Sequence, residues 1–173
     1  VRELGEAVAY IREHAAEWKV DPAKIIVCGS SAAGHLACSL GVFWDNELVY
    51  DAIGRTPAQI RPDGLILCYP VITGGEYAHV NSFKRLLGDD VTQEQRDAVS
   101  LENFVTEQTP RAFIWHTYTD ENVPVENSLL LAAAMKRKNV NFELHIYPTG
   151  GHGLSLADEE TAGNGFQVVE QCQ

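Results

Sequence analysis

The sequence predicts an α/β fold with a mostly parallel sheet and helices on both of its faces. Two observations lead to this prediction. Short apolar runs of strand length alternate with segments of helical periodicity, an order that is typical of βαβ units. The apolar runs are continuous, as expected for strands that are covered on both faces. A chain of 173 residues with 45% hydrophobic residues suits one domain, 1–173, with a sizeable core.

The predicted elements follow one another along the chain. Residues 1–18 place apolar side chains at helical spacing, which predicts a helix. A strand over 24–28 follows, then a sharp turn at 29–31 and a helix from about 32 to 44. A long, less regular connection over 71–109 suits the wall of a substrate pocket. The remaining predicted elements are strands at 65–69, 112–116 and 142–147, helices near 82–87, 93–99 and 125–138, and a helical tail after Leu156 that Gly163 and Gly165 weaken.

The first residue, Val1, already lies within the helical pattern. Helices usually begin at a capping residue, and none precedes this one. We therefore expect the chain to be the C-terminal portion of a larger α/β domain, without its N-terminal part. The strand at 24–28 is then expected to lie at an open edge of the sheet or to pair with another chain, either a second copy or a complementing N-terminal segment.

Charge and composition exclude several classes of function. The net charge of −11 repels phosphate backbones, so we expect no nucleic-acid partner. No apolar run approaches the ~20 residues that cross a bilayer and no signal peptide opens the sequence, so we expect no membrane partner. Cysteine spacing predicts no metal site, and no cofactor is expected. The cysteines are predicted to be buried, reduced thiols, which favours the cytoplasm: Cys28, Cys38, Cys68 and Cys172.

The strongest signal for chemistry is the segment 29–34, which reads GSSAAG. It follows a predicted strand and precedes a predicted helix, the context in which a nucleophilic serine sits on a strained turn. Such a turn needs small residues two positions before and two positions after the serine, and Gly29 and Ala33 supply them for Ser31. Ser30 matches this rule less well. An ordinary Gly-Ser turn is the alternative, whereas phosphate binding is disfavoured because no lysine follows at P-loop spacing.

A nucleophilic serine needs a base, and the base needs an orienting carboxylate. Asp120 lies just beyond the strand predicted at 112–116, and His152 lies in a glycine-rich loop beyond the strand at 142–147. Parallel sheets of this kind place their sites at the carboxyl ends of the strands. We therefore predict Ser31 as nucleophile, Asp120 as acid and His152 as base.

Other residues compete for these roles. Glu121 adjoins Asp120 and is an alternative acid. His116 ends a strand close to Asp120, and His79 lies in the long connection, so both are candidates for substrate contact. Further histidines and one acidic pair are interpreted as structural or solvated: His14, His35, His145, Asp89 and Asp90.

Taken together, these motifs resemble the acetyl esterase and acetylxylan-esterase-like branch of the α/β-hydrolases, which is grouped with lipase-like and prolyl-oligopeptidase-like esterases. The matching segments span nearly the whole chain in the right order: 29–37, 69–72, 75–79, 82–83, 115–117, Asp120 with 123–128, and 151–156. The resemblance implies the same triad and a small ester substrate, with O-acetyl groups of sugars as the expected class. Members of this group carry a His-Gly-Gly or Gly-Gly-Gly oxyanion segment ahead of the first helix, and these residues do not include one.

We therefore expect hydrolysis of small esters through an acyl-enzyme on Ser31. Within the sequence, the backbone N–H of Ala32, the residue after the nucleophile, is the expected oxyanion donor. A second donor is expected from preceding residues or from another chain. The alternative is a non-catalytic or poorly active fragment that needs a partner chain or additional N-terminal strands. A serine peptidase is a third hypothesis, but the sequence shows no propeller and no peptide-anchoring feature.

Overall fold

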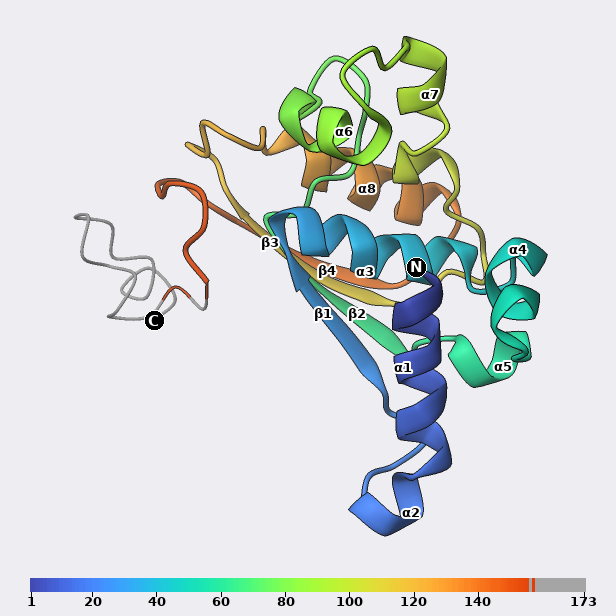
Figure 1. Ribbon diagram of the computed structural model, residues 1–173. Helices are drawn as coiled ribbons and strands as arrows, with labels where there is room; N and C mark the ends of the chain where they lie inside the picture. Colours follow the sequence, from blue (N-terminus) through green and yellow to red (C-terminus); the bar gives the residue numbers. More distant parts are fainter. Residues whose placement is uncertain (156, 158–173) are drawn as a thin grey trace.

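A four-stranded sheet forms the centre of the protein (Figure 1). The computed structural model describes residues 1–155 and 157, and the helical tail predicted after Leu156 lies outside these residues except for Ala157. The strands are β1 (Ile26–Ser30), β2 (Gly64–Cys68), β3 (Ala112–Thr117) and β4 (Phe142–Tyr147). They lie in the order β1-β2-β3-β4 and every neighbouring pair is parallel, which confirms the predicted α/β fold.

The connections between the strands are largely helical. The helices and 3-10 helices are α1 (Arg2–Glu13), α2 (Ala15–Trp18), α3 (Ser31–Phe43), α4 (Glu47–Tyr50), η1 (Asp51–Ile53), α5 (Pro57–Ile60), α6 (Val80–Leu87), α7 (Gln93–Asp97), η2 (Leu101–Asn103) and α8 (Glu126–Arg137). The helix predicted over 1–18 is divided at His14, whose φ of −95° and ψ of 9° lie outside the helical region. The three short elements between α3 and β2 have too few turns to show apolar periodicity.

The strand that leads to the candidate nucleophile lies two residues later than predicted, at 26–30 instead of 24–28. Gly29 and Ser30 pair with Leu67 and Cys68 of β2, so the ladder continues to the last residue before α3. No separate turn intervenes, because α3 begins at Ser31 directly. β1 is also the edge strand: β2 pairs with one side, and no strand among the described residues pairs with the other.

The main core lies on one face of the sheet. α3 contacts β1 and β2, while α8 contacts β3 and β4. The core combines alternate residues of the strands with residues of α1, α3 and α8, among them Val27, Leu65, Leu67, Ile114, Val8, Leu40, Leu131 and Met135. The sequence predicts helices on both faces of the sheet. Among the residues that the structure describes, the helices that build this core all lie on the same face.

The opposite face of the sheet is partly open. Ile26 is 42% exposed and Ile66 is 36% exposed, and both point to this face. At the carboxyl ends of the strands, a small cluster of Tyr69, Trp115 and Leu154 covers the face. A continuous apolar run therefore shows that both faces are apolar, but it does not show what covers each of them.

The prediction of buried cysteines is wrong for Cys28. This side chain points to the open face of the edge strand and is exposed, whereas Cys38 and Cys68 are buried. Burial raises the pKa of the Cys38 thiol to about 12, so this thiol is inert. Cys172 lies outside the described residues. Among the helices that the structure describes, none combines the length and apolar character that a membrane span requires.

Candidate active site

Ser31 stands at the junction of β1 and α3 with an unusual backbone conformation. Its φ is 52°, in the left-handed region that residues other than glycine rarely occupy. A conformation of this kind costs free energy and is retained mainly where function uses it. The strain points the Ser31 side chain away from the helix, at the carboxyl end of the sheet.

The glycines beside Ser31 allow this junction to form. A Cβ on Gly29 would lie 2.2 Å from the carbonyl oxygen of Ala33, so only glycine lets the first turn of α3 approach β1. A Cβ on Gly34 would lie 2.7 Å from the Cβ of Pro70, which follows β2. The small residues of segment 29–34 are therefore a packing requirement of the turn.

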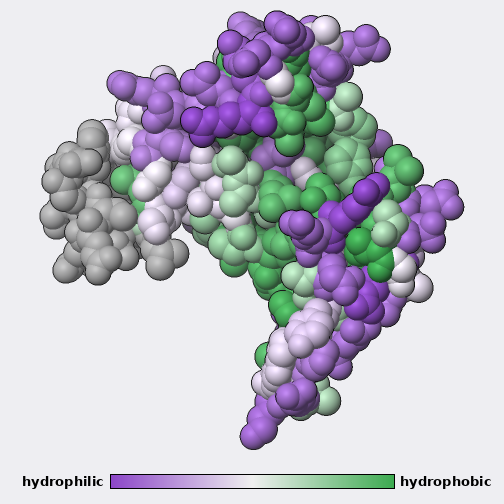
Figure 2. Space-filling view, viewed as in Figure 1, coloured by the Kyte–Doolittle hydropathy of each residue, from purple (hydrophilic) through white to green (hydrophobic). Residues whose placement is uncertain are grey.

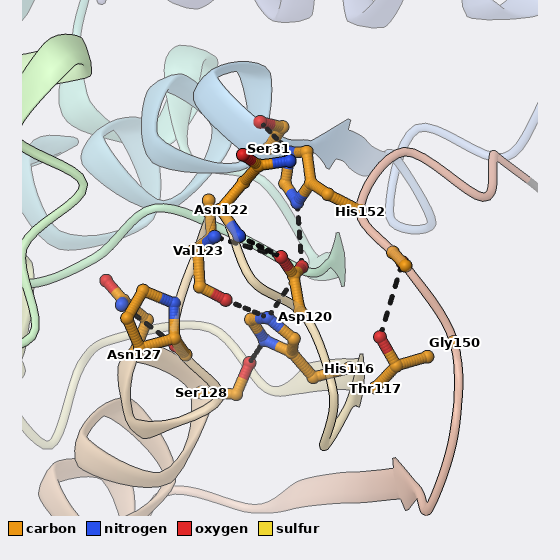
Figure 3. Close-up of polar contacts among 12 residues, drawn as sticks. Ser31, His116, Thr117, Asp120, Asn122, Val123, Asn127, Ser128, Gly150 and His152 are labelled. Carbon is orange, nitrogen blue, oxygen red and sulfur yellow. Dashed lines mark hydrogen bonds and ion pairs between the residues drawn. The ribbon is translucent and has the colours of Figure 1, made fainter.

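The structure brings the three residues of the predicted triad into one hydrogen-bonded chain (Figure 3). Ser31 Oγ lies 2.8 Å from His152 Nε2. The other ring nitrogen of His152, Nδ1, lies 2.7 Å from Asp120 Oδ2. The three residues come from the carboxyl ends of β1, β3 and β4, which parallel strands bring to the same edge of a sheet.

Asp120 is held as a carboxylate by its surroundings. Its side chain is fully buried, and its Oδ1 accepts hydrogen bonds from the backbone N–H groups of Asn122 and Val123, both at 2.9 Å. Burial raises the pKa of Asp120, but hydrogen bonds from two histidines and from these backbone groups outweigh burial and hold the pKa well below its ordinary value. Glu121 is exposed, so the geometry favours Asp120 over this alternative acid.

Two residues to which the sequence analysis assigns no role hold the loop of His152. The hydroxyl of Thr119 donates to the carbonyl of Gly150 and accepts from its N–H, both at 2.9 Å. Tyr69 packs edge-on against the His152 ring, with 5.1 Å between ring centroids, and its hydroxyl accepts from the N–H of Ser155. Tyr69 lies in the matching segment 69–72, but the sequence gives neither Tyr69 nor Thr119 a role, because both act through contacts with a segment far away in the sequence.

The N-terminus of α3 presents backbone donors beside the serine. Ala32 lies in the first turn of α3, where N–H groups have no partner within the helix, and no side chain caps this end. The helix dipole adds partial positive charge there. Both features suit the N–H of Ala32 for stabilising an oxyanion that forms on a group attached to Ser31.

The two predicted substrate contacts differ in their positions. His116 is fully buried beneath Asp120, so substrate cannot reach it and this prediction is wrong. A polar residue at the end of a buried strand can face the core instead of the site, and the sequence does not distinguish the two. His79 precedes α6 and its Nδ1 lies 2.8 Å from Ser82 Oγ. Burial is the main cause that lowers the pKa of His79. Contact of His79 with substrate stays a prediction.

The remaining histidines lie outside the triad. The ring of His35 bonds the carbonyl of Val99 at 3.0 Å, His145 pairs with exposed Glu143, and His14 stacks beside Trp18. In the described part of the chain, no group of three or more His, Cys, Asp or Glu residues could hold a metal ion.

An apolar cavity of about 320 Å³ opens beside Ala32. Its walls come from α3, α6 and the residues after β2, and include Leu36, Val71, Phe83 and Leu101. Figure 2 shows hydrophobic surface in this region, between the N-terminal end of α1 and α6. The cavity therefore provides apolar space next to the candidate oxyanion donor.

Comparison with known proteins gives the family. The sequence model of the BD-FAE family matches residues 1–135. The chain belongs to the BD-FAE family. A solved structure of an acetyl ester-xyloside bifunctional hydrolase from Caldicellulosiruptor lactoaceticus superposes on this BD-FAE chain with a TM-score of 0.80 and 41% identity. The likeness to this and related structures confirms the α/β-hydrolase fold.

Two curated proteins are also similar to the BD-FAE chain. Endo-1,4-beta-xylanase B of Butyrivibrio fibrisolvens is 41% identical over 164 residues, which cover 92% of this chain and 25% of that protein. The acetylxylan esterase of Xylanibacter ruminicola is 29% identical over 161 residues, covering 90% of this chain and 31% of that protein. The solved structure is matched over 98% of this chain and 61% of its own. The BD-FAE chain thus spans a quarter to a third of the length of these curated relatives.

Proposed function

We propose that this chain is a serine carboxylic-ester hydrolase that acts on small esters, with O-acetyl groups of carbohydrates as its substrate class. The observation that carries the proposal is the hydrogen-bonded chain from Ser31 Oγ through His152 to Asp120. Family membership and the acetyl-ester relatives support the choice of an ester over a peptide bond.

The contacts of the triad suggest how each group acts. Ser31 Oγ attacks the ester carbonyl carbon while His152 Nε2 takes the hydroxyl proton. Asp120 stabilises the imidazolium and keeps the Nδ1 proton of His152 in place. The oxyanion points at the N–H of Ala32 until the C–O bond breaks and the alcohol leaves with the proton from His152. Water, activated by the same histidine, then releases the carboxylic acid from Ser31.

The substrate class is tested with a matched series of 4-nitrophenyl esters and with acetylated xylo-oligosaccharides. We expect kcat/KM to be highest for acetate and to fall as the acyl chain lengthens, because the relatives are named for acetyl esters. Release of acetate from the oligosaccharides is the second expected result. Faster cleavage of long-chain esters than of the acetate would contradict the proposed substrate class.

The role of Asp120 is tested by replacing it with asparagine. The amide holds His152 in the wrong tautomer, so we expect kcat to fall roughly 10⁴-fold. Glu121→Gln is the matched control, because Glu121 is adjacent and exposed, and we expect its kcat to equal that of the wild type. An Asp120→Asn variant with more than a tenth of wild-type kcat would argue against the triad.

A second candidate function is a poorly active fragment that works only with a partner chain or with complementing N-terminal strands. The observation in its favour is the outer edge of β1, with which no strand of residues 1–155 pairs, together with exposed Ile26 and Cys28. Ester hydrolysis by the chain alone, measured beside its native mass by light scattering, separates the two. Turnover by a monomer would exclude the fragment, whereas a self-associated or inactive chain would favour it.

A further inference from the structure

A second histidine lies beneath the triad in a closed, polar arrangement. His116, near the end of β3, is 0% exposed. Its Nε2 lies 2.9 Å from the carbonyl oxygen of Val123 and 3.3 Å from Asp120 Oδ2. Its Nδ1 lies 2.8 Å from the hydroxyl of Ser128, in the first turn of α8 (Figure 3).

These contacts determine where the ring carries its proton. Nε2 faces a carbonyl and a carboxylate, and both can only accept, so Nε2 bears a hydrogen. Ser128 Oγ is buried and has no other partner among the described residues, so its hydroxyl donates to Nδ1. A proton on Nδ1 as well would leave the Ser128 hydroxyl without an acceptor, which is costly in a buried place. His116 is therefore a neutral imidazole with its hydrogen on Nε2.

The Nε2–H of His116 donates to the carbonyl of Val123 at 2.9 Å, and Nε2 also lies 3.3 Å from Asp120 Oδ2, the oxygen that accepts from His152. Asp120 Oδ2 accepts from His152 Nδ1 at 2.7 Å and faces His116 at 3.3 Å, while Oδ1 takes two backbone N–H groups. Oδ1 thus has two donors, and Oδ2 has one donor together with the nearby Nε2 of His116, so rotation of the carboxylate would break three hydrogen bonds and the contact with His116. The bond from His116 also contributes to the low pKa of Asp120.

From this geometry we propose that His116 is a positioning residue that orients the Asp120 carboxylate toward His152. The inference rests on the proposed function, because it assigns His116 a role in the same triad. His116 also ties three segments together: β3, the loop that carries Asp120 and Val123, and the start of α8 through Ser128. It acts on the reaction only through Asp120, since buried His116 cannot meet substrate.

The test uses two amide variants, each of which retains the hydrogen-bonding group of one ring nitrogen of His116. Glutamine places an amide N–H near the position of Nε2, so His116→Gln retains a donor toward Asp120. Asparagine places its amide near Nδ1, so His116→Asn retains the contact with Ser128 and loses the donor. We expect His116→Asn to lower kcat roughly 10- to 100-fold, the scale of one hydrogen bond to a charged group, with KM unchanged. We expect His116→Gln to stay within about 3-fold of wild-type kcat.

NMR spectroscopy tests the role of His116 independently of enzymatic activity. In ¹⁵N-histidine-labelled wild-type protein, we expect the nitrogen shifts of His116 to show a protonated Nε2 and an unprotonated Nδ1. We expect the low-field proton resonance of His152 Nδ1–H to persist in His116→Gln and to broaden or disappear in His116→Asn. A wild-type His116 protonated at Nδ1, or a His152 resonance unaffected in both variants, would overturn the inference.

The two arms separate this inference from the proposed function. If the wild-type protein hydrolyses no ester, the proposed function fails, and the His152 resonance in the two variants still decides the role of His116. If the wild type is active and the two variants lose kcat equally, His116 is not a positioning residue, although the proposed function stands. Circular dichroism of both variants shows that each is folded under the assay conditions.

Discussion

Replacing Ser31 with alanine is expected to abolish ester hydrolysis, lowering kcat on the order of a millionfold, as removal of a catalytic nucleophile does. The variant loses the oxygen that lies 2.8 Å from His152 Nε2. The backbone at position 31 keeps a residue with a Cβ, so its left-handed strain is unchanged and the fold is expected to persist. The measurements are kcat with 4-nitrophenyl acetate and the midpoint of thermal unfolding.

Ser30→Ala is the matched control for this prediction. Ser30 is the adjacent serine, it is exposed at the end of β1, and its side chain makes no capping hydrogen bond to α3. We expect Ser30→Ala to retain wild-type kcat. Loss of activity in Ser30→Ala with retention in Ser31→Ala would transfer the nucleophile to Ser30 and contradict the proposed triad.

Replacing Gly29 with alanine is expected to destabilise the protein more than adding a methyl group at any other position of this site. The new Cβ would lie 2.2 Å from the carbonyl oxygen of Ala33, 2.6 Å from its carbonyl carbon and 2.9 Å from the N of Gly34. All three atoms belong to the backbone of α3, so no side chain can rotate away and the helix itself has to shift from β1. Overpacking of a core costs roughly 1–3 kcal/mol, and a backbone clash lies at or beyond the upper end of this range.

Urea denaturation measures this effect directly. We expect the unfolding midpoint of Gly29→Ala to fall and kcat to fall with it, because Ser31 and the N–H of Ala32 move with α3. Gly5→Ala is the control: Gly5 lies within α1, and a Cβ there would meet its neighbours at 3.5 Å, an ordinary contact. Alanine favours a helix interior by about 0.5–1 kcal/mol, so Gly5→Ala is expected to be as stable as the wild type or more so. Equal midpoints for Gly29→Ala and the wild type would disprove the packing argument.

The triad could be predicted from the sequence because each member follows a strand at a position that parallel topology brings to one edge. Ser31 is marked by the small residues around it, and Asp120 and His152 follow short apolar runs with clear bounds. The strand at 142–147 has the bounds that its apolar run predicts. These features are local, so they are visible in one sequence.

The supporting residues could not be predicted, because their roles depend on contacts between distant segments. Tyr69 touches the His152 loop and Thr119 bonds Gly150, and neither pair is close in sequence. His116 was placed near the site by its position in the strand, but which face its side chain occupies depends on the register of β3 with its neighbours. The exposed side chain of Cys28 could not be predicted for the same reason, because an apolar run does not indicate which face of the sheet is left exposed to solvent.

The left-handed backbone of Ser31 has a consequence for laboratory evolution of this protein. Glycine at position 31 would adopt the same φ of 52° without the crowding of a Cβ, which relieves about 1 kcal/mol. A library screened for heat resistance alone would therefore enrich glycine at the one position where it removes the proposed nucleophile. A screen that demands turnover and heat resistance together would retain the serine, and its stabilising substitutions would accumulate at other positions.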